Sequence, residues 1–166
     1  MSNKKAQIVS LDLTIAIVLF SIIVIAIIVF FDLFLNRLQT NLIETEILNN
    51  AFAMSDFLVT TSGEPTKWSN SSVRVLGLAD YDRVLSEAKL NNLSKLNYNY
   101  TKGLLKIDIF DYDYSILITD LNKTSQGIVY SYGISPSPSA KTVIKIRRYV
   151  IFKNETSIFE LDLWKG

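Results

Sequence analysis

The chain has 166 residues, of which 17 are basic and 16 acidic, and it contains neither cysteine nor histidine. Without cysteine it has no disulfides and no zinc–thiolate site, and without histidine it lacks the commonest general base and transition-metal ligand. The balanced charge gives no basic patch for nucleic acid. We therefore expect no enzyme activity, no metal, no cofactor and no nucleic-acid partner.

An unbroken apolar run extends from Leu13 to Phe31, directly after Asp12 and a short polar leader. At about 1.5 Å per residue such a helix is roughly 28 Å long, which matches the hydrocarbon core of a bilayer. A cleaved secretory signal is the rival interpretation, but its apolar region has about 7 to 15 residues and ends at small residues. Residues 30–34 read FFDLF, so we expect a single membrane span.

Two features predict that the amino terminus is cytoplasmic and the rest of the chain is outside. Lys4 and Lys5 precede the apolar run, whereas Arg37 is the only basic residue between positions 32 and 50, and positive charge favours the cytoplasmic side. Asn-x-Ser/Thr triplets, which are glycosylation acceptors in exported proteins, occur only after the run. Their asparagines are Asn70, Asn92, Asn99, Asn122 and Asn154. The alternative is that a surface rich in asparagine and serine produces such triplets by chance.

The helical period continues beyond the membrane run, and no glycine or proline interrupts it before Gly63. We expect one helix from about Ser10 to about Leu58, roughly 70 Å long. An exposed apolar stripe is unstable in water, so its outer half must lie against the following domain, against other copies, or both. Two adjoining stripes with steps of three or four residues are Phe31, Leu35, Leu38, Leu42 and Ile43, Ile47, Ala51, Met54, Leu58.

Residues 60–166 are expected to form one small α+β head with a single core. Turn formers fill residues 60–70. A short strand or extended segment is predicted at Val73–Leu78, followed by a short helix at Asp80–Leu93 in which Asp80 is the N-cap.

Alternating apolar residues then predict a series of strands, of which the last two form a hairpin. Two prolines exclude residues 135–139 from the interior of the sheet. The predicted strands are Leu104–Phe110, Tyr114–Thr119, Gly127–Tyr132, Thr142–Phe152 and Ile158–Trp164. The sequence thus predicts a leader (1–6), a transmembrane and stalk helix (7–59), and a mostly antiparallel β-sheet head with one short helix (60–166).

The N-terminal residues resemble those of a known family. The leader ends Lys5-Ala6-Gln7, and Ser10-Leu11-Asp12 precedes a membrane run that merges into an amphipathic stalk. This arrangement resembles archaeal type IV pilins and pilin-like proteins, whose class III signal peptides have a small residue before the cleaved bond, a Gln after it and a Ser-x-acid motif. The usual spacing is Gln-x-Ser-x-Glu, whereas this chain has one extra residue and Asp in place of Glu. The resemblance covers about the first 58 residues.

The resemblance implies that a membrane-embedded prepilin peptidase cleaves between Ala6 and Gln7, with the preceding lysines and Ser10 as parts of the signal. The apolar helix then packs with those of other subunits in a filament core. By the same resemblance Asp12 is the acidic residue near the new amino terminus, and a free amine created by cleavage offsets its charge. The alternative is that Asp12, or Ser10, caps the helix at the water interface.

Weaker candidates lie in the head. Asp108, Asp111, Asp113 and Asp120 offer the hard oxygen ligands that Ca²⁺ prefers, but the glycine and terminal glutamate of an EF-hand are missing. We therefore interpret these acids as the solvated face of two strands and their turn. All eight tyrosines follow residue 80, which suits a contact surface or glycan binding but is also explained by strand propensity.

The charged residues of the last two predicted strands have an ordinary interpretation. Glu155 and Glu160 are expected to pair with Lys153 across the hairpin. Three bases, Lys145, Arg147 and Arg148, are expected to form a solvated edge.

Two functions from different classes fit this sequence. The first is a pilin-like structural subunit, major or minor, of an archaeal type IV-type surface filament, inserted in the membrane before assembly. The alternative is a permanently anchored single-pass binding or accessory protein outside the cytoplasm. An envelope enzyme that uses the aspartates or a Ser-Lys pair is disfavoured by the absence of histidine.

Overall fold

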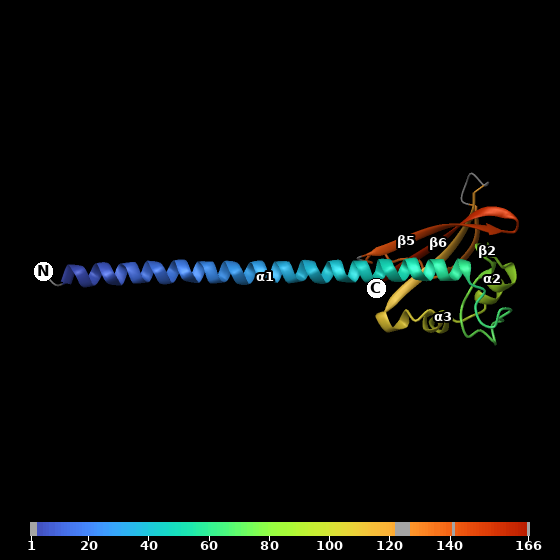
Figure 1. Ribbon diagram of the computed structural model, residues 1–166, viewed down its shortest axis with the longest axis horizontal. Helices are drawn as coiled ribbons and strands as arrows, with labels where there is room; N and C mark the ends of the chain where they lie inside the picture. Colours follow the sequence, from blue (N-terminus) through green and yellow to red (C-terminus); the bar gives the residue numbers. More distant parts are fainter. Residues whose placement is uncertain (1–2, 122–126, 141, 166) are drawn as a thin grey trace. The chain divides into compact units, whose positions relative to one another are not determined.

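The chain divides into two compact units, residues 1–43 and 44–166. The computed structural model describes residues 3–121, 127–140 and 142–165, and the described side chains begin at Leu13 and omit residues 39–43. The first unit is helical throughout its described part, whereas the second unit contains every strand that the structure describes (Figure 1).

Helix α1 (Asn3–Thr60) is 58 residues long, which confirms the prediction of one continuous helix through both apolar stripes. It forms because no helix-breaking residue precedes Gly63. Beyond its last turn, the Thr61 hydroxyl donates a hydrogen bond of 2.8 Å to the carbonyl of Phe57. The same carbonyl also accepts a hydrogen bond of 3.0 Å from the backbone amide of Thr61, so a terminal carbonyl of the helix has two donors.

The second unit is built on a six-stranded sheet in the order β1-β2-β5-β6-β3-β4. Neighbouring strands are antiparallel except for β2 and β5, which are parallel. The one parallel pair makes the sheet mixed, and because the described strands and helices are grouped along the chain rather than alternating, the fold is α+β, as predicted. The strands are β1 (Ala79–Tyr81), β2 (Val84–Leu85), β3 (Tyr112–Asp120), β4 (Ile128–Gly133), β5 (Val143–Phe152) and β6 (Glu155–Lys165).

The predicted hairpin is confirmed as β5 and β6, which pair along their full length from Val143↔Trp164 to Phe152↔Glu155. The two residues that connect them, Lys153 and Asn154, both have positive φ, at 53° and 63°. Two such residues form the turn whose twist matches that of the flanking strands. The strands predicted at 114–119 and 127–132 are also confirmed, and residues 135–139 lie outside the sheet.

One face of the sheet and the last four turns of α1 share a single hydrophobic core. Along α1 the predicted second stripe is buried, whereas the side chain of Ile43 lies outside the described residues. Because α1 presents this stripe every three or four residues, it places a continuous apolar ridge in the core. The largest buried side chains are Ile47, Leu58, Leu76, Leu78, Leu90, Leu93, Tyr114, Ile116, Ile118, Phe159, Leu161 and Leu163.

The helix predicted at 80–93 is wrong in its first half. Asp80 lies in β1 rather than at a helix N-cap, and α2 (Glu87–Leu93) begins after Ser86. Residues 84–85 are strand because the parallel pairing of Val84 with Ile151 places them in the sheet. The segment predicted at 73–78 forms no strand: within it only Val75 bridges another residue, Glu64.

The strand predicted at 104–110 is also wrong, because α3 (Tyr98–Leu104) and the 3-10 helix η1 (Asp108–Phe110) occupy this region. The Asn97 side chain caps α3 by accepting hydrogen bonds from the backbone amides of Asn99 and Tyr100. Alternation was misleading here, since Ile107 is buried but Ile109 is 77% exposed. The described part of the head therefore has two short helices besides η1 instead of the single one predicted.

Hydrogen bonds from tyrosine hydroxyl groups link α2 and α3 to the sheet. The Tyr114 hydroxyl donates to Thr101 over 2.6 Å, and the Tyr130 hydroxyl donates to the carbonyl of Leu90 over 2.9 Å. Burial raises the pKa of Tyr130 to about 12, so this hydroxyl stays neutral at physiological pH. Some of the tyrosines that follow residue 80 therefore serve the packing of the head rather than a contact surface.

Candidate functional site

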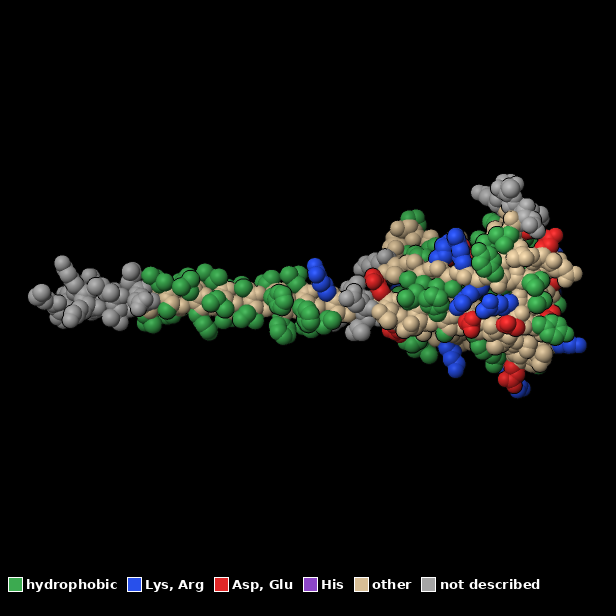
Figure 2. Space-filling model, turned by 45° about the horizontal axis from the view of Figure 1, so that its top comes forward, with side chains coloured by type: hydrophobic (Ala, Val, Ile, Leu, Met, Phe, Trp, Pro, Cys, Tyr) green, Lys and Arg blue, Asp and Glu red, His purple; other side chains and the backbone are tan. Residues whose placement is uncertain are grey.

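The most conspicuous surface of the first unit is the helical segment Leu13–Leu38, whose mean hydropathy is 3.3. None of its apolar window is buried, and Figure 2 shows hydrophobic side chains over the visible face of this segment. A core helix of a soluble domain is mostly covered, and this one is not. Its length and composition fit a membrane span and also a signal sequence.

Few polar groups interrupt this segment. The Ser21 hydroxyl donates to the carbonyl of Ile17 over 2.8 Å, so it is satisfied within the helix. The only charged residues between positions 13 and 38 are Asp32 and Arg37. Both are exposed, and neither forms an ion pair within the described part of the chain. A charged side chain near the end of an apolar helix costs free energy when lipid covers it, so charges at such positions often have a function.

The residues of the predicted leader are helical in their backbone from Asn3 onward. The side chains of Lys4, Lys5, Ala6, Gln7, Ser10 and Asp12 lie outside the described residues. Cleavage after Ala6 and charge pairing by Asp12 therefore stay predictions.

The predicted glycosylation acceptors differ in accessibility. Asn70 and Asn154 are exposed in turns, and Asn99 is exposed in the first turn of α3. Asn92 is half-buried in α2, and its side-chain amide donates to the carbonyl of Trp68 over 3.2 Å. Asn122 lies outside the described residues. Because an acceptor amide must be free to react, Asn92 is the poorest of the four described acceptors.

The aspartates considered for calcium are used separately. Asp113 forms an ion pair of 3.0 Å with Lys102 and accepts a hydrogen bond from the Tyr98 hydroxyl. Asp108 is the first residue of η1 and Asp111 follows its last, whereas Asp120 is buried at the end of β3. Over the described ranges, no three potential ligands gather in a metal site.

The pairing predicted for the hairpin charges is wrong. Lys153 instead forms an ion pair of 2.7 Å with Glu87 of α2, so it joins two elements. On β6 the buried Glu160 accepts hydrogen bonds from Lys145 and, over 2.6 Å, from Arg147. The register explains this choice, because Arg147 is directly opposite Glu160.

The sequence predicted that the three bases of β5 form one solvated edge, and this prediction is wrong. Alternation along the strand turns Arg148 to the opposite face from Lys145 and Arg147. Its guanidinium donates to the Ser55 hydroxyl of α1 over 3.3 Å and lies over the ring of Phe52. The base therefore joins the sheet to α1 within the second unit.

Two neighbouring acids on β6 respond to burial in opposite ways. Burial by itself raises the pKa of Glu160, but the hydrogen bonds from Lys145 and Arg147 outweigh it and leave this pKa lowered. For Asp162 burial dominates and raises the pKa. One of its carboxylate oxygens, Oδ1, is buried without a hydrogen-bond partner. Glu160 is thus stabilised as an anion, whereas Asp162 is not.

Glu160→Gln is expected to lower the free energy of unfolding by about 1 kcal/mol at pH 7, since the half-exposed bases are screened by solvent. A lowered folded-state pKa stabilises the fold above the unfolded pKa of about 4.3, and this contribution is lost as pH falls through the lower folded value. Urea titrations of the full chain in detergent, followed by fluorescence, should show the difference at pH 7 and its loss near pH 3. Asp162→Asn is the matched control, and an equal loss at pH 7 would contradict this account.

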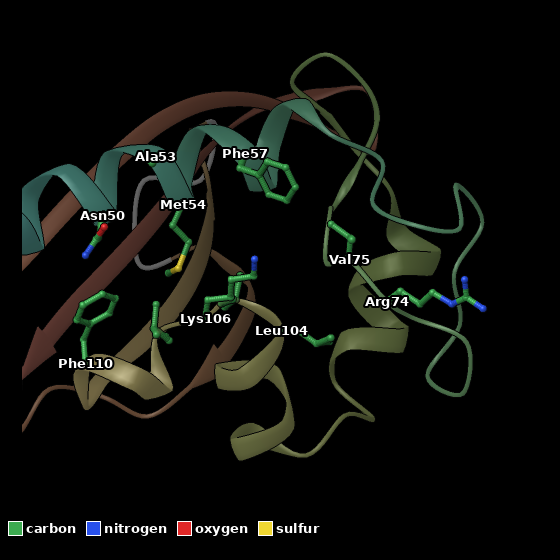
Figure 3. A pocket seen from close by; sticks show the side chains of 11 residues that line it. Asn50, Ala53, Met54, Phe57, Arg74, Val75, Leu104, Lys106 and Phe110 are labelled. Atoms are coloured by element: carbon green, nitrogen blue, oxygen red, sulfur yellow. The ribbon is translucent and has the colours of Figure 1, made fainter.

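A groove of about 500 Å³ opens in the second unit between α1 and the segment from Leu104 to Phe110. Figure 3 shows Met54 and Phe57 on the α1 side and Phe110 on the other. Its lining is mostly apolar, but Lys106 extends its amine into the groove, whereas the guanidinium of Arg74 points away (Figure 3). In the described ranges Lys106 has no ion-pair partner.

Sequence reasoning missed this groove. It is formed because α3 and η1, with Lys106 at a positive φ of 56° between them, turn the chain towards α1. The region was predicted as a strand, and a strand would have placed the side chains of 104–110 on the two faces of a sheet. A non-glycine residue with positive φ leaves little trace in a single sequence.

Comparison of the chain with known protein families, with curated proteins and with solved structures finds no match.

Proposed function

We propose that this chain is a pilin-like structural subunit of a type IV-type surface filament, held in the membrane by Leu13–Leu38 before assembly. One observation carries the proposal: the uncovered apolar helix continues, as part of α1, into the ridge that forms the core of the second unit. One helix, α1, therefore contributes residues to both units. A separable anchor joined by a flexible linker would have no need of this continuity.

The uncovered helix needs an apolar environment at every stage. Transfer of its side chains from water to lipid or to neighbouring helices is favourable by roughly 25 cal/mol for each square ångström covered. In the membrane the lipid covers the helix, and in a filament the helices of other subunits cover it. The lysines at positions 4 and 5 orient the helix with its amino terminus in the cytoplasm, and the exposed Asn70, Asn99 and Asn154 accept glycans outside.

Mass spectrometry of the mature amino terminus tests the proposal. In a cell that possesses a prepilin peptidase, we expect the protein to begin at Gln7. Ala6→Trp is expected to abolish processing because a bulky residue replaces the small one, whereas Ala6→Gly is the matched control and should be processed normally. Electron microscopy with a tag on the head should show filaments with the control and none with Ala6→Trp.

An intact leader in the wild-type protein would overturn the proposal. The alternative, a permanently anchored accessory protein, is favoured by the groove at Lys106, which gives the head a place to hold a ligand. This alternative would be supported if Ala6→Trp and the wild-type protein had the same localisation and the same uncleaved amino terminus.

A further inference from the structure

We propose that the groove at Lys106 receives α1 of a second copy of this chain, with Asp32 of that copy paired to Lys106. This inference rests on the proposed function, since assembly brings copies together, and it identifies which surfaces meet. Each of the two surfaces is mostly apolar but contains a charged side chain without an ion-pair partner in the described residues. The groove is lined mostly by apolar side chains, with Asn50, Arg74 and Lys106 as its polar members, and Lys106 has no ion-pair partner in the described ranges. The helix Leu13–Leu38 is mostly apolar, and its charged residues are Asp32 and Arg37.

The chemistry of the groove restricts its occupant. An apolar partner that covered Lys106 without bringing a negative charge would bury an unpaired ammonium, at a cost of several kcal/mol. The uncharged stretch Leu13–Phe31 fails this requirement. A strongly charged partner also fails, because Met54, Phe57, Leu104 and the other apolar side chains would not be covered by matching surface.

The helix around Asp32 meets both conditions. Residues three and four positions away lie on the same helix face, so Ile28 and Leu35 flank Asp32 one turn to either side. Both are about half exposed, at 55% and 47%, and Asp32 itself is exposed. This face, which we call the Asp32 ridge (Ile28, Asp32, Leu35), is a mostly apolar ridge with one carboxylate in its middle and Asn36 beside it.

Pairing of Asp32 with Lys106 fixes the register between two copies. An apolar ridge alone can slide along an apolar groove, because hydrophobic contact is not directional. A slip of one helical turn, about 5.4 Å, would separate the two charges and leave both covered without a partner. The pair therefore selects one axial position, as buried polar residues do in coiled coils.

The chain offers a direct test because it contains no cysteine. Copies carrying Leu35→Cys on the ridge are mixed with copies carrying Ala53→Cys at the groove, assembled in filaments, where copies are staggered along the axis, and oxidised. We expect a covalent dimer between the two variants. Phe34→Cys, on the opposite face of the same helix, is the matched control and should give little dimer with Ala53→Cys.

Charge reversal tests the pairing itself. Asp32→Lys or Lys106→Asp alone should lower the cross-linked fraction about tenfold, and the two substitutions together should restore it, because a pair worth about 1.4 kcal/mol corresponds to a factor of ten. Equal dimer from Phe34→Cys, or cross-linking that ignores both reversals, would overturn the pairing. Co-purification of an anionic lipid that Lys106→Asp releases, without any cross-link, would assign the groove to lipid instead.

The outcome is separable from that of the proposed function. Cleaved subunits in filaments that lack the Leu35–Ala53 cross-link would overturn the pairing and leave the filament proposal standing. A charge-dependent cross-link between copies purified in detergent, from cells that form no filament, would do the reverse. If no filament forms and no cross-link appears, the filament proposal and the pairing proposal are both overturned.

Discussion

Replacing Leu58 with alanine is expected to lower the free energy of unfolding of the head by about 3 kcal/mol. Leu58 is fully buried at the end of the α1 ridge, in the core cluster that also contains the sheet. The substitution removes three heavy atoms and leaves a cavity that close-packed neighbours fill only in part. Both tryptophans, Trp68 and Trp164, are 2% exposed, so fluorescence of the full chain in detergent reports unfolding of the head.

The urea midpoint is expected to fall by roughly 2 M, given slopes of about 1 to 2 kcal/mol per molar for domains of this size. Leu48→Ala is the matched control, because Leu48 lies on the same helix but is 38% exposed. It should lose less than about 1 kcal/mol. Similar losses for the two variants would contradict the placement of the α1 ridge in the core.

Gly77→Ala is expected to destabilise the head by about 3 kcal/mol or more, through a clash of backbones rather than a cavity. A Cβ at position 77 would lie 2.5 Å from the carbonyl oxygen of Thr61 and would also meet the backbone nitrogen of Gly63. Neither atom belongs to a side chain that could move aside. The carbonyl of Gly77 also accepts a hydrogen bond of 2.8 Å from the Trp68 indole, so a shift of this backbone would disturb a second buried contact.

Gly103→Ala is the control for this prediction. A Cβ at Gly103 in α3 would meet only the Asp108 carboxylate, at 3.9 Å. Alanine also restricts the unfolded chain and favours the helix, so this variant should be more stable by roughly 0.5 to 1 kcal/mol. Opposite signs for the two glycines, measured by the same fluorescence titration, are the expected result; a neutral Gly77→Ala would contradict it.

The sequence predicted correctly wherever one periodic pattern was long. Helix α1 was evident because apolar residues recur at helical spacing with no breaker before Gly63. The hairpin of β5 and β6 was evident because apolar residues alternate along Thr142–Phe152 and Ile158–Trp164, although β6 begins three residues earlier than predicted, at Glu155. In such segments local preference and burial favour the same structure, so the pattern alone is decisive.

Short segments were misassigned because tertiary contacts overrode the local pattern. Residues 84–85 are strand through pairing with β5, although their neighbours suggested a helix. Residues 104–110 alternate like a strand but form the end of α3, a short connection and η1, and among them Ile107 alone is buried deeply. A pattern of four or five apolar residues fits either structure, and the partner surface decides between them.

The sequence by itself determined that an apolar helix able to cross a membrane precedes an α+β head, because hydropathy and period are properties of the chain. Only the tertiary structure decided which charged side chains have partners and which groups these partners are. It turned Arg148 towards α1 and Glu160 towards Lys145 and Arg147, and it left Lys106 unpaired in an apolar groove. Whether a charge is paired depends on which strands and helices become neighbours in space, and spacing along the chain does not encode this for residues far apart.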